Sequence, residues 1–263
     1  MDKLAIKIIF LLTISFTYIQ AKEHKLELGI AAGALYYPNY IGSKSTQNLI
    51  TPLPYIRYRG EWFRIDEDGL SGKLFGINGL RIDLSISGSL PAQSEEYGAR
   101  AGMPDLDLTG EVGFQLVYQL YQNSPHCLEF EFPLRAVLST DFTNLKYRGI
   151  VSNPQLKYSL NFSEFEWSFR FGGVFGDEDY NNYYYGVKQA YVTKQRKFYK
   201  SNSGFAGFRS RVGMTYEKDS WWVGAFVSYF NIQNAVFSDS PLVETDHSIY
   251  SGVSVAYIFY TSD

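Results

Sequence analysis

Residues 105 to 140 alternate between apolar and polar side chains along most of their length. The even positions carry mainly Leu, Phe, Val and Tyr, and the odd positions carry mainly Asp, Glu, Gln, Arg and Thr. A period of two predicts β-strands, because successive side chains of a strand point to opposite faces. The turn residues Gln122 to Pro125 divide the stretch into two strands, each more than twice the usual length of about 5–6 residues. Strands of about 9–11 residues cross a bilayer when tilted by about 45°, so this pair is typical of a membrane-spanning sheet.

The rest of the chain repeats the pattern with varying clarity. It predicts twelve extended segments, at about residues 26–37, 49–58, 61–66, 70–76, 80–87, 105–120, 128–139, 155–162, 164–171, 204–216, 221–230 and 247–260. Asn78-Gly79 is a strong hairpin signal, since both residue types adopt the positive φ angles of a type I′ turn. Pro52 and Pro54 lack the backbone N–H that a central ladder position uses. The second segment is therefore expected to be bent or partly unpaired at its start.

The connections between these segments sort by length. Longer connections follow the first, fifth, seventh, ninth and eleventh segments, including 38–48, 91–104, 141–153 and 177–203, whereas short turns follow the second, fourth, sixth, eighth and tenth. Transmembrane barrels show this asymmetry between their two ends. The sequence therefore predicts an all-β fold, an antiparallel up-and-down transmembrane β-barrel of about 12 strands with short periplasmic turns and longer extracellular loops.

Composition narrows the class further. Mean hydropathy is −0.19, and beyond the N-terminus there is no run of about 18 apolar residues, so spanning helices are not expected. Aromatic residues make up 17% of the chain, which fits the aromatic girdles of a barrel in the cell outer membrane. Residues 1–21, with Lys3 and Lys7 before an apolar run, are expected to be a cleaved signal peptide, which leaves 22–263 as the barrel domain. The lone Cys127 excludes an internal disulfide.

Charged side chains gather on the polar face of the predicted strands. The residues expected to form a charge network in the lumen are Arg81, Asp83, Asp105, Asp107, Glu111, Glu129, Glu131 and Arg135. Crowded carboxylates repel one another in a low-dielectric lumen unless basic partners or water offset their charge. Three interpretations stay open: an ion-pair network that supports the wall, a cation-selective lining, and a divalent metal site. Asp-x-Asp without the glycine-bearing loop of an EF-hand is a weak calcium signal, so no metal or cofactor is predicted.

The longest predicted loop, 177–203, is rich in basic residues. They are Lys188, Lys194, Arg196, Lys197 and Lys200, interleaved with aromatic residues. In an extracellular loop these side chains would meet the phosphates of lipopolysaccharide, and the alternative is a solvated loop without a ligand. The formal net charge of −3, with the remaining basic residues dispersed, predicts no nucleic-acid partner. Outer-membrane lipid and lipopolysaccharide are the expected surroundings.

The histidines indicate whether the barrel could be an enzyme. His24, His126 and His247 are the histidines of the chain. A lipid hydrolase would need Ser, His and an orienting polar group within hydrogen-bond reach. Ser248 points to the face opposite His247, and Ser251 lies two pleats away on the same face. No catalytic site is therefore predicted, and the chain is not expected to be an enzyme.

Several short motifs follow one another over nearly the whole mature chain. They are Pro38-Asn39-Tyr40-Ile41-Gly42-Ser43, Leu53-Pro54-Tyr55, Met103-Pro104-Asp105-Leu106-Asp107, Glu111-Val112-Gly113, Tyr184-Tyr185-Gly186-Val187 and Ser240-Pro241-Leu242. Through this ordered set the chain resembles the MltA-interacting protein/OmpV family of outer-membrane proteins. The resemblance implies a barrel without enzymatic activity. The family's best-known role is that of a scaffold joining a lytic murein transglycosylase to a peptidoglycan synthase, a penicillin-binding protein.

The sequence is compatible with two functions. Inward Tyr, Arg and Glu side chains from many strands predict a filled lumen, which favours a scaffold of the cell envelope. The alternative is a small outer-membrane channel or porin-like protein with a charged lumen. Conductance across a planar bilayer distinguishes the two.

Overall fold

The computed structural model describes residues 25–60, 63–66, 69–94 and 98–262, and it shows one antiparallel sheet. The strands are β1 (Lys25–Pro38), β2 (Thr46–Arg59), β3 (Phe63–Asp66), β4 (Gly69–Ile77), β5 (Leu80–Ser89), β6 (Leu108–Asn123), β7 (His126–Thr140), β8 (Leu145–Ser152), β9 (Gln155–Phe162), β10 (Phe165–Gly176), β11 (Gly204–Lys218), β12 (Trp221–Asn231) and β13 (His247–Thr261). The expected signal peptide at 1–21 lies outside the described residues.

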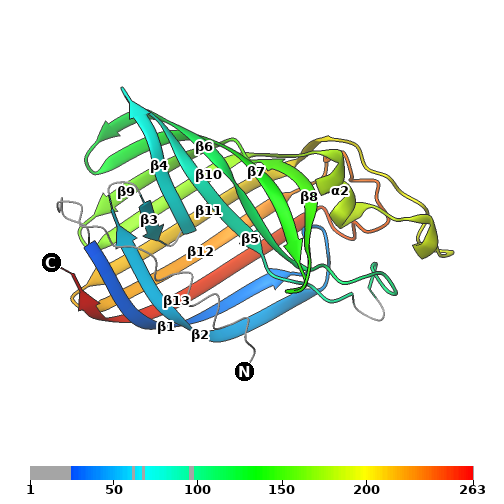
Figure 1. The fold of residues 1–263 in the computed structure, drawn as a ribbon, viewed down its shortest axis with the longest axis horizontal. Coiled ribbons are helices and arrows are strands. Elements are labelled where there is room, and N and C mark those ends of the chain that lie inside the picture. Colours follow the sequence, from blue (N-terminus) through cyan, green and yellow to red (C-terminus); the bar gives the residue numbers. More distant parts are fainter. Residues whose placement is uncertain (1–24, 61–62, 67–68, 95–97, 263) are drawn as a thin grey trace.

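The sheet closes on itself into a barrel. β1 pairs with both β2 and β13, β11 pairs with both β10 and β12, and every other strand also has a neighbour on each side. β8 and β9 follow one another along β7, so the thirteen strands occupy twelve positions around the wall. The start of β1 and the end of β13 lie at one end, and helix α2 (Glu178–Tyr185) lies at the other (Figure 1). The predicted up-and-down barrel is confirmed.

Side chains sort by face along each strand. On β6 the even-numbered Phe114 is 60% exposed, whereas the odd-numbered Val117 is fully buried. Exposed outward side chains include Ile30, Ile50, Ile82, Phe132, Phe169, Val227, Val255 and Phe259, and buried inward ones include Glu27, Asp83, Glu129 and Glu131. An apolar outside around a polar inside is the arrangement of a barrel in lipid. Among the described residues, no helix is long and apolar enough to cross a membrane.

The predicted loop at 141–153 is wrong in its second part. Residues 145–152 form β8 against β7, and only residues 141–144 connect the two strands. Gly149 has a φ of 113°, and the ladder shifts register between Val137 and Leu138. Such a bulge changes the phase of the alternation. A strict period of two therefore does not detect this strand.

The predicted loop at 177–203 contains helix α2. The carboxylate of Asp177 accepts a hydrogen bond from the backbone N–H of Tyr180 at 2.8 Å, and Glu178 and Asp179 follow in the first turn. Both features favour the start of a helix. The helix has only 8 residues, too few to show a clear helical period in the sequence. A 3₁₀ turn at Gln189–Tyr191 follows it.

The wall is interrupted beside β2. The ladder between β2 and the four-residue β3 joins only two residue pairs, Tyr58↔Ile65 and Arg59↔Arg64. Within the described residues, β2 pairs with β1 alone from residue 46 to residue 57. This is the unpaired stretch that Pro52 and Pro54 predict. On the far side of the interruption, β5 has β4 as a partner only as far as Ser85 and continues against β6 alone.

Candidate functional site

Ion pairs join neighbouring strands inside the barrel. Arg81 on β5 donates to Asp83 on the same strand and to Glu129 on β7, each at 2.8 Å. Arg135 on β7 donates from Nε to Glu111 on β6 at 2.8 Å. Each of these carboxylates faces a guanidinium, which offsets the repulsion among the acids. The arrangement is that of an ion-pair network spanning three adjacent strands.

Of the other predicted luminal acids, Glu131 belongs to this interior and Asp105 does not. Glu131 accepts a hydrogen bond from Gln155 on β9 at 2.7 Å and lies 4.0 Å from Arg170 on β10. Asp105 precedes β6 and is exposed, and it accepts from the backbone N–H of Ser94 at 2.7 Å. The alternation suggested an inward position for Asp105, but the strand begins only at Leu108. Its carboxylate orders a loop instead.

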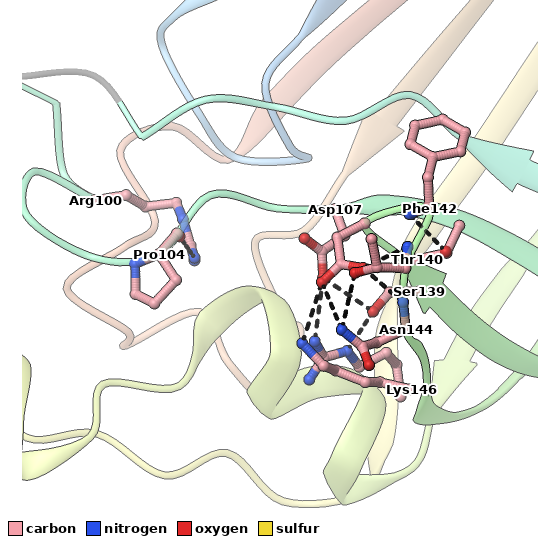
Figure 2. A network of polar contacts seen from close by, with 11 residues as sticks. Arg100, Pro104, Asp107, Ser139, Thr140, Phe142, Asn144 and Lys146 are labelled. Carbon is pink, nitrogen blue, oxygen red and sulfur yellow. Dashed lines mark hydrogen bonds and ion pairs between the residues drawn. The ribbon is translucent and has the colours of Figure 1, made fainter. Parts of the chain in front are cut away.

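Asp107 lies at the rim of the barrel beside a basic partner. Arg148 donates to Asp107 at 3.4 Å and to Ser139 at 2.7 Å, and the Ser139 hydroxyl donates to Asp107 at 3.2 Å. Figure 2 shows Asp107 and Ser139 pointing toward one another, with Arg100 and Pro104 apart from them on the neighbouring loop. The Arg148 guanidinium also stacks 4.4 Å above the ring of Tyr183 in α2. This group therefore fastens the helix to the rim.

Helix α2 lies at the mouth, where residues 39–45, 90–94, 98–107 and 232–246 pack around it; we call α2 with these loop segments the plug. The ring of Tyr185 stacks on that of Phe237, with 3.5 Å between centroids. The Tyr185 hydroxyl donates to the carbonyl of Ile41 at 2.9 Å, and the Ser240 hydroxyl donates to the carbonyl of Tyr185 at 2.7 Å. One helical residue thus ties two loops together over the bore.

The third loop of the plug is held by Arg100. Its Nη1 donates to the carbonyl of Tyr184 and its Nη2 to that of Pro104, both at 3.0 Å. Burial lowers the pKa of Arg100, although a guanidinium keeps its charge in proteins. Burial also raises the pKa of Tyr184 to about 12 and raises the pKa values of Tyr180 and Tyr185 well above their usual range. Neutral phenols therefore fill the mouth at physiological pH.

Two adjacent cavities lie inside the barrel beneath the plug. The cavity next to the plug measures about 350 Å³ and the other about 370 Å³. The first is lined by residues that include Tyr180, Tyr184, Arg209 and Tyr250. The second is lined by residues that include Gly33, Leu53, Tyr55 and Trp222. Leu35, Arg211 and Phe226 line both, so the two cavities are adjacent, and we call them together the chamber.

The predicted basic loop residues do not all face solvent. Lys188, Lys194, Lys197 and Lys200 are exposed. Lys200 also lies 2.6 Å from Glu178 in an ion pair. Arg196 is buried and donates to two backbone carbonyls, of Tyr191 at 2.9 Å and of Ala99 at 2.8 Å. The guanidinium of Arg196 therefore stabilises the loop and does not face a ligand outside it.

The histidine constellation has no catalytic geometry among the described residues, which do not include His24. His126 Nδ1 lies 2.6 Å from the hydroxyl of Tyr158, and His247 Nδ1 lies 2.6 Å from that of Tyr229. The hydroxyl of Ser248, on the inner face, accepts from the backbone N–H of Gly42 at 2.9 Å. Over the same described residues, no group of three or more metal-ligating side chains is present.

The basic lining of the chamber is what sequence reasoning missed. Arg170, Arg209 and Arg211 point into the lumen from the adjacent strands β10 and β11. The signal was available, since Arg209 and Arg211 are two residues apart in an alternating segment and must share a face. Their pairing with β10, which adds Arg170 opposite Arg211, is a matter of register that the sequence does not display.

A closed sheet with an apolar outer face, a charged interior and short turns at the end where β1 starts and β13 ends defines an outer-membrane β-barrel. Residues 30–259 match the family described as MltA-interacting protein MipA. The chain belongs to this family.

Two relatives are outer-membrane proteins of Vibrio species. Outer membrane protein OmpV of Vibrio cholerae is 25% identical over 206 residues, which cover 77% of this chain and 76% of that protein. Outer membrane protein Omp26La of Vibrio anguillarum is 35% identical over 91 residues, which cover 34% of this chain and 35% of that protein. The match to Omp26La thus spans about a third of the relative's length. The protein is accordingly located in the outer membrane.

Solved structures align over most of the chain at low identity. The COG4313 outer membrane channel from Pseudomonas putida F1 shares 9% identity at a TM-score of 0.45, covering 93% of this chain and 99% of that chain. A bacterial polysaccharide outer membrane secretin shares 9% identity at a TM-score of 0.43, covering 89% and 99%. Neither likeness bears on function.

Proposed function

We propose that the protein is a non-enzymatic scaffold of the outer membrane. It would hold peptidoglycan-remodelling enzymes, a lytic transglycosylase with a penicillin-binding protein, at the periplasmic side. The family description, MltA-interacting protein, supports a partner of this kind. The observation that carries the proposal is the plug, in which Tyr185 and Phe237 are 4% and 1% exposed. A barrel with a filled mouth offers an anchor and a surface rather than a path for solutes.

A small channel with a charged lumen is the second candidate, and the chamber is the feature that favours it. The energetics of the plug weigh against it. Burying the rings of Tyr185 and Phe237 contributes roughly 3–6 kcal/mol together. A plug held by that energy is open for about 1% of the time or less. Steady conduction would require a trigger that displaces α2.

Two measurements test the scaffold together. The mature barrel in a planar bilayer is expected to give no steady stepwise current. In cells, a photo-crosslinking residue replacing Lys218, exposed at the end of β11 beside the short turn to β12, is expected to capture murein enzymes. The same residue replacing Lys194 in the opposite loop is the matched control and is expected to capture none. Steady currents without capture at position 218 would overturn the proposal in favour of the channel.

The opposite end of the barrel suits a different partner. Lys188, Lys194 and Lys197 are exposed on the long loop that carries α2. We infer that these ammonium groups contact the phosphates of lipopolysaccharide, because charge-assisted contacts of this kind are the natural ones for such a loop. The chain would thus be held by lipid phosphates outside and would present its turns to enzymes inside.

A further inference from the structure

Helix α2 borders a third cavity, which we call the outer cavity. Tyr180 and Tyr184 of the helix line the chamber, whereas Asp179, Asn182 and Tyr183 line the outer cavity. The helix therefore has one face toward each. The outer cavity measures about 730 Å³, within the range of about 300–1,000 Å³ that is typical of ligand-binding clefts.

The outer cavity is accessible from outside the barrel. Its wall comes from the segment 100–107, the start of β8 and the connection 178–200. Lys146, Lys188, Phe198 and Lys200 line it and are exposed. A ligand in the medium or at the membrane surface therefore reaches it without passing the plug.

Aromatic rings form much of this wall. The aromatic lining residues are Tyr147, Tyr183, Tyr191, Phe198 and Tyr199. The ring of Tyr183 is covered on one face by the Arg148 guanidinium, whereas Phe198 is 57% exposed and offers its ring to a ligand. The C–H groups on the face of a sugar ring carry a weak positive charge, and they pack well on the negative face of an aromatic ring.

The charged groups of the lining are of both signs. The acidic ones are Asp105, Asp107, Glu178 and Asp179, and the basic ones are Arg100, Lys146, Arg148, Lys188 and Lys200. Glu178 pairs with Lys200 at 2.6 Å and Asp107 with Arg148 at 3.4 Å. An anionic ligand would meet carboxylates here, and a cationic one would meet ammonium and guanidinium groups. Hydroxyl groups suit such a mixture, because each of them both donates and accepts hydrogen bonds.

The wall of the outer cavity is ordered by its own hydrogen bonds. The amide of Asn182 donates to the carbonyl of Ser201 and accepts from its N–H, both at 2.9 Å. Val187 and Tyr199 exchange backbone hydrogen bonds at 2.8 and 3.2 Å, and the Tyr199 hydroxyl donates to the carbonyl of Val236 at 3.2 Å. A wall that is ordered before binding lowers the entropic cost of holding a ligand.

We propose that the outer cavity binds a neutral oligosaccharide, either free in the medium or as the sugar part of lipopolysaccharide. One sugar ring packs on Phe198, and its hydroxyl groups donate to the carboxylate of Asp179 and accept from the ammonium group of Lys146. Lys194 and Lys197 are exposed and, within the part of the chain that the structure describes, lie outside this lining. The site is therefore distinct from the lysine contacts to phosphate, and it does not depend on the proposed scaffold.

The test is calorimetric titration of the full barrel, purified in a detergent without a sugar head group, with maltohexaose, mannohexaose and chitohexaose. Saturable binding of at least one hexasaccharide is expected. Phe198→Ala is expected to weaken that binding roughly five- to tenfold, the energy of one stacking contact. Phe142→Ala is the matched control, because Phe142 is 79% exposed on the neighbouring loop and Figure 2 shows its ring pointing away from Asp107 and Lys146. It is expected to bind as the unaltered protein does.

A charge variant tests whether the ligand is neutral. Asp179→Asn is expected to weaken hexasaccharide binding roughly threefold, because a neutral acceptor makes a weaker hydrogen bond than a carboxylate. Asp246→Asn is the control, since Asp246 is exposed at the same end of the barrel and, among the described residues, lies outside the lining. Tighter binding by Asp179→Asn would indicate an anionic ligand and would overturn the proposal, as would the absence of saturable binding by all three hexasaccharides.

Competition distinguishes the two sources of the sugar. Displacement of the hexasaccharide by core oligosaccharide freed from lipid A would assign the site to lipopolysaccharide, and binding without such displacement would assign it to a free oligosaccharide; both results support the proposal. The double variant Lys194→Gln, Lys197→Gln is expected to bind the hexasaccharide unchanged. Heat-modifiable migration on gels confirms that each variant is folded. Binding that is lost in the lysine variant and unchanged in folded Phe198→Ala would place the sugar elsewhere and overturn the proposal.

Discussion

The β6–β7 hairpin and the β2–β3 hairpin belong to the same wall and differ in continuity. The β6–β7 ladder runs from Leu108↔Thr140 to Asn123↔His126, whereas β2 and β3 share two residue pairs. Strand β2 shows an apolar outer face with Ile50 and Ile56 exposed, as β6 does with Phe114, so the alternation is similar in the two regions. The difference lies in the edge, because β2 carries prolines where a second ladder would need donors. The alternation of apolar and polar side chains indicates that a strand faces lipid. Whether the wall continues beyond that strand depends on the backbone N–H groups available along its edge.

The largest expected effect comes from moving a proline into the continuous region. Leu116 pairs with Ile82 on one side and Phe132 on the other, so Leu116→Pro removes a ladder hydrogen bond whichever edge its N–H serves. In hydrocarbon an unsatisfied backbone group costs several kcal/mol. We expect Leu116→Pro to lose the heat-modifiable folded form on gels. Pro52→Leu is expected to keep it, and equal loss by both variants would refute the distinction between the two edges.

The plug offers the next largest effect. Tyr185→Ala removes the stack on Phe237 and the hydroxyl contact to Ile41, at a cost of roughly 3–5 kcal/mol for a buried aromatic ring. We expect steady stepwise currents in a planar bilayer, because the mouth then lacks its central ring. Phe198→Ala, which removes a 57% exposed aromatic from the same connection, is the control and is expected to stay silent. Silence of the Tyr185 variant would mean that the lumen is closed below the plug.

Alkaline pH is expected to act on the plug through its buried phenols. Burial raises the pKa of Tyr184 from 10.0 to about 12, so its contribution to stability is complete below pH 10 and falls as the pH rises toward 12. The loss is at most about 2–3 kcal/mol. Currents are expected to appear in this window, and Tyr184→Phe is expected to shift their onset to higher pH. An unchanged onset would show that other tyrosines, such as Tyr180, control the opening.

The sequence predicts the wall better than the site. The outward rows, the Asn78-Gly79 turn and the unpaired stretch at Pro52 follow from local chemistry, namely side-chain alternation and missing donors. Strand β8 does not, because the bulge at Gly149 breaks the phase. The sequence pattern does not predict the plug either. Tyr185, Ile41 and Phe237 come from three distant segments, which meet only because the barrel closes. Arg211 joins Arg170 for the same reason, through register between strands.

The smallest expected effect concerns the exposed lysines of the loop that follows α2. Replacing Lys188, Lys194 and Lys197 by Gln removes three solvated charges, each of which contributes about 1 kcal/mol or less to phosphate binding at a surface. We expect the triple variant to fold normally and to retain several-fold less lipopolysaccharide on purification. Arg196→Gln is the contrasting variant, because Arg196 holds backbone carbonyls of Tyr191 and Ala99. It should loosen the loop, measured as faster proteolysis there, while the three lysines stay in place. Unchanged lipopolysaccharide retention in the triple variant would leave these lysines as a solvated surface.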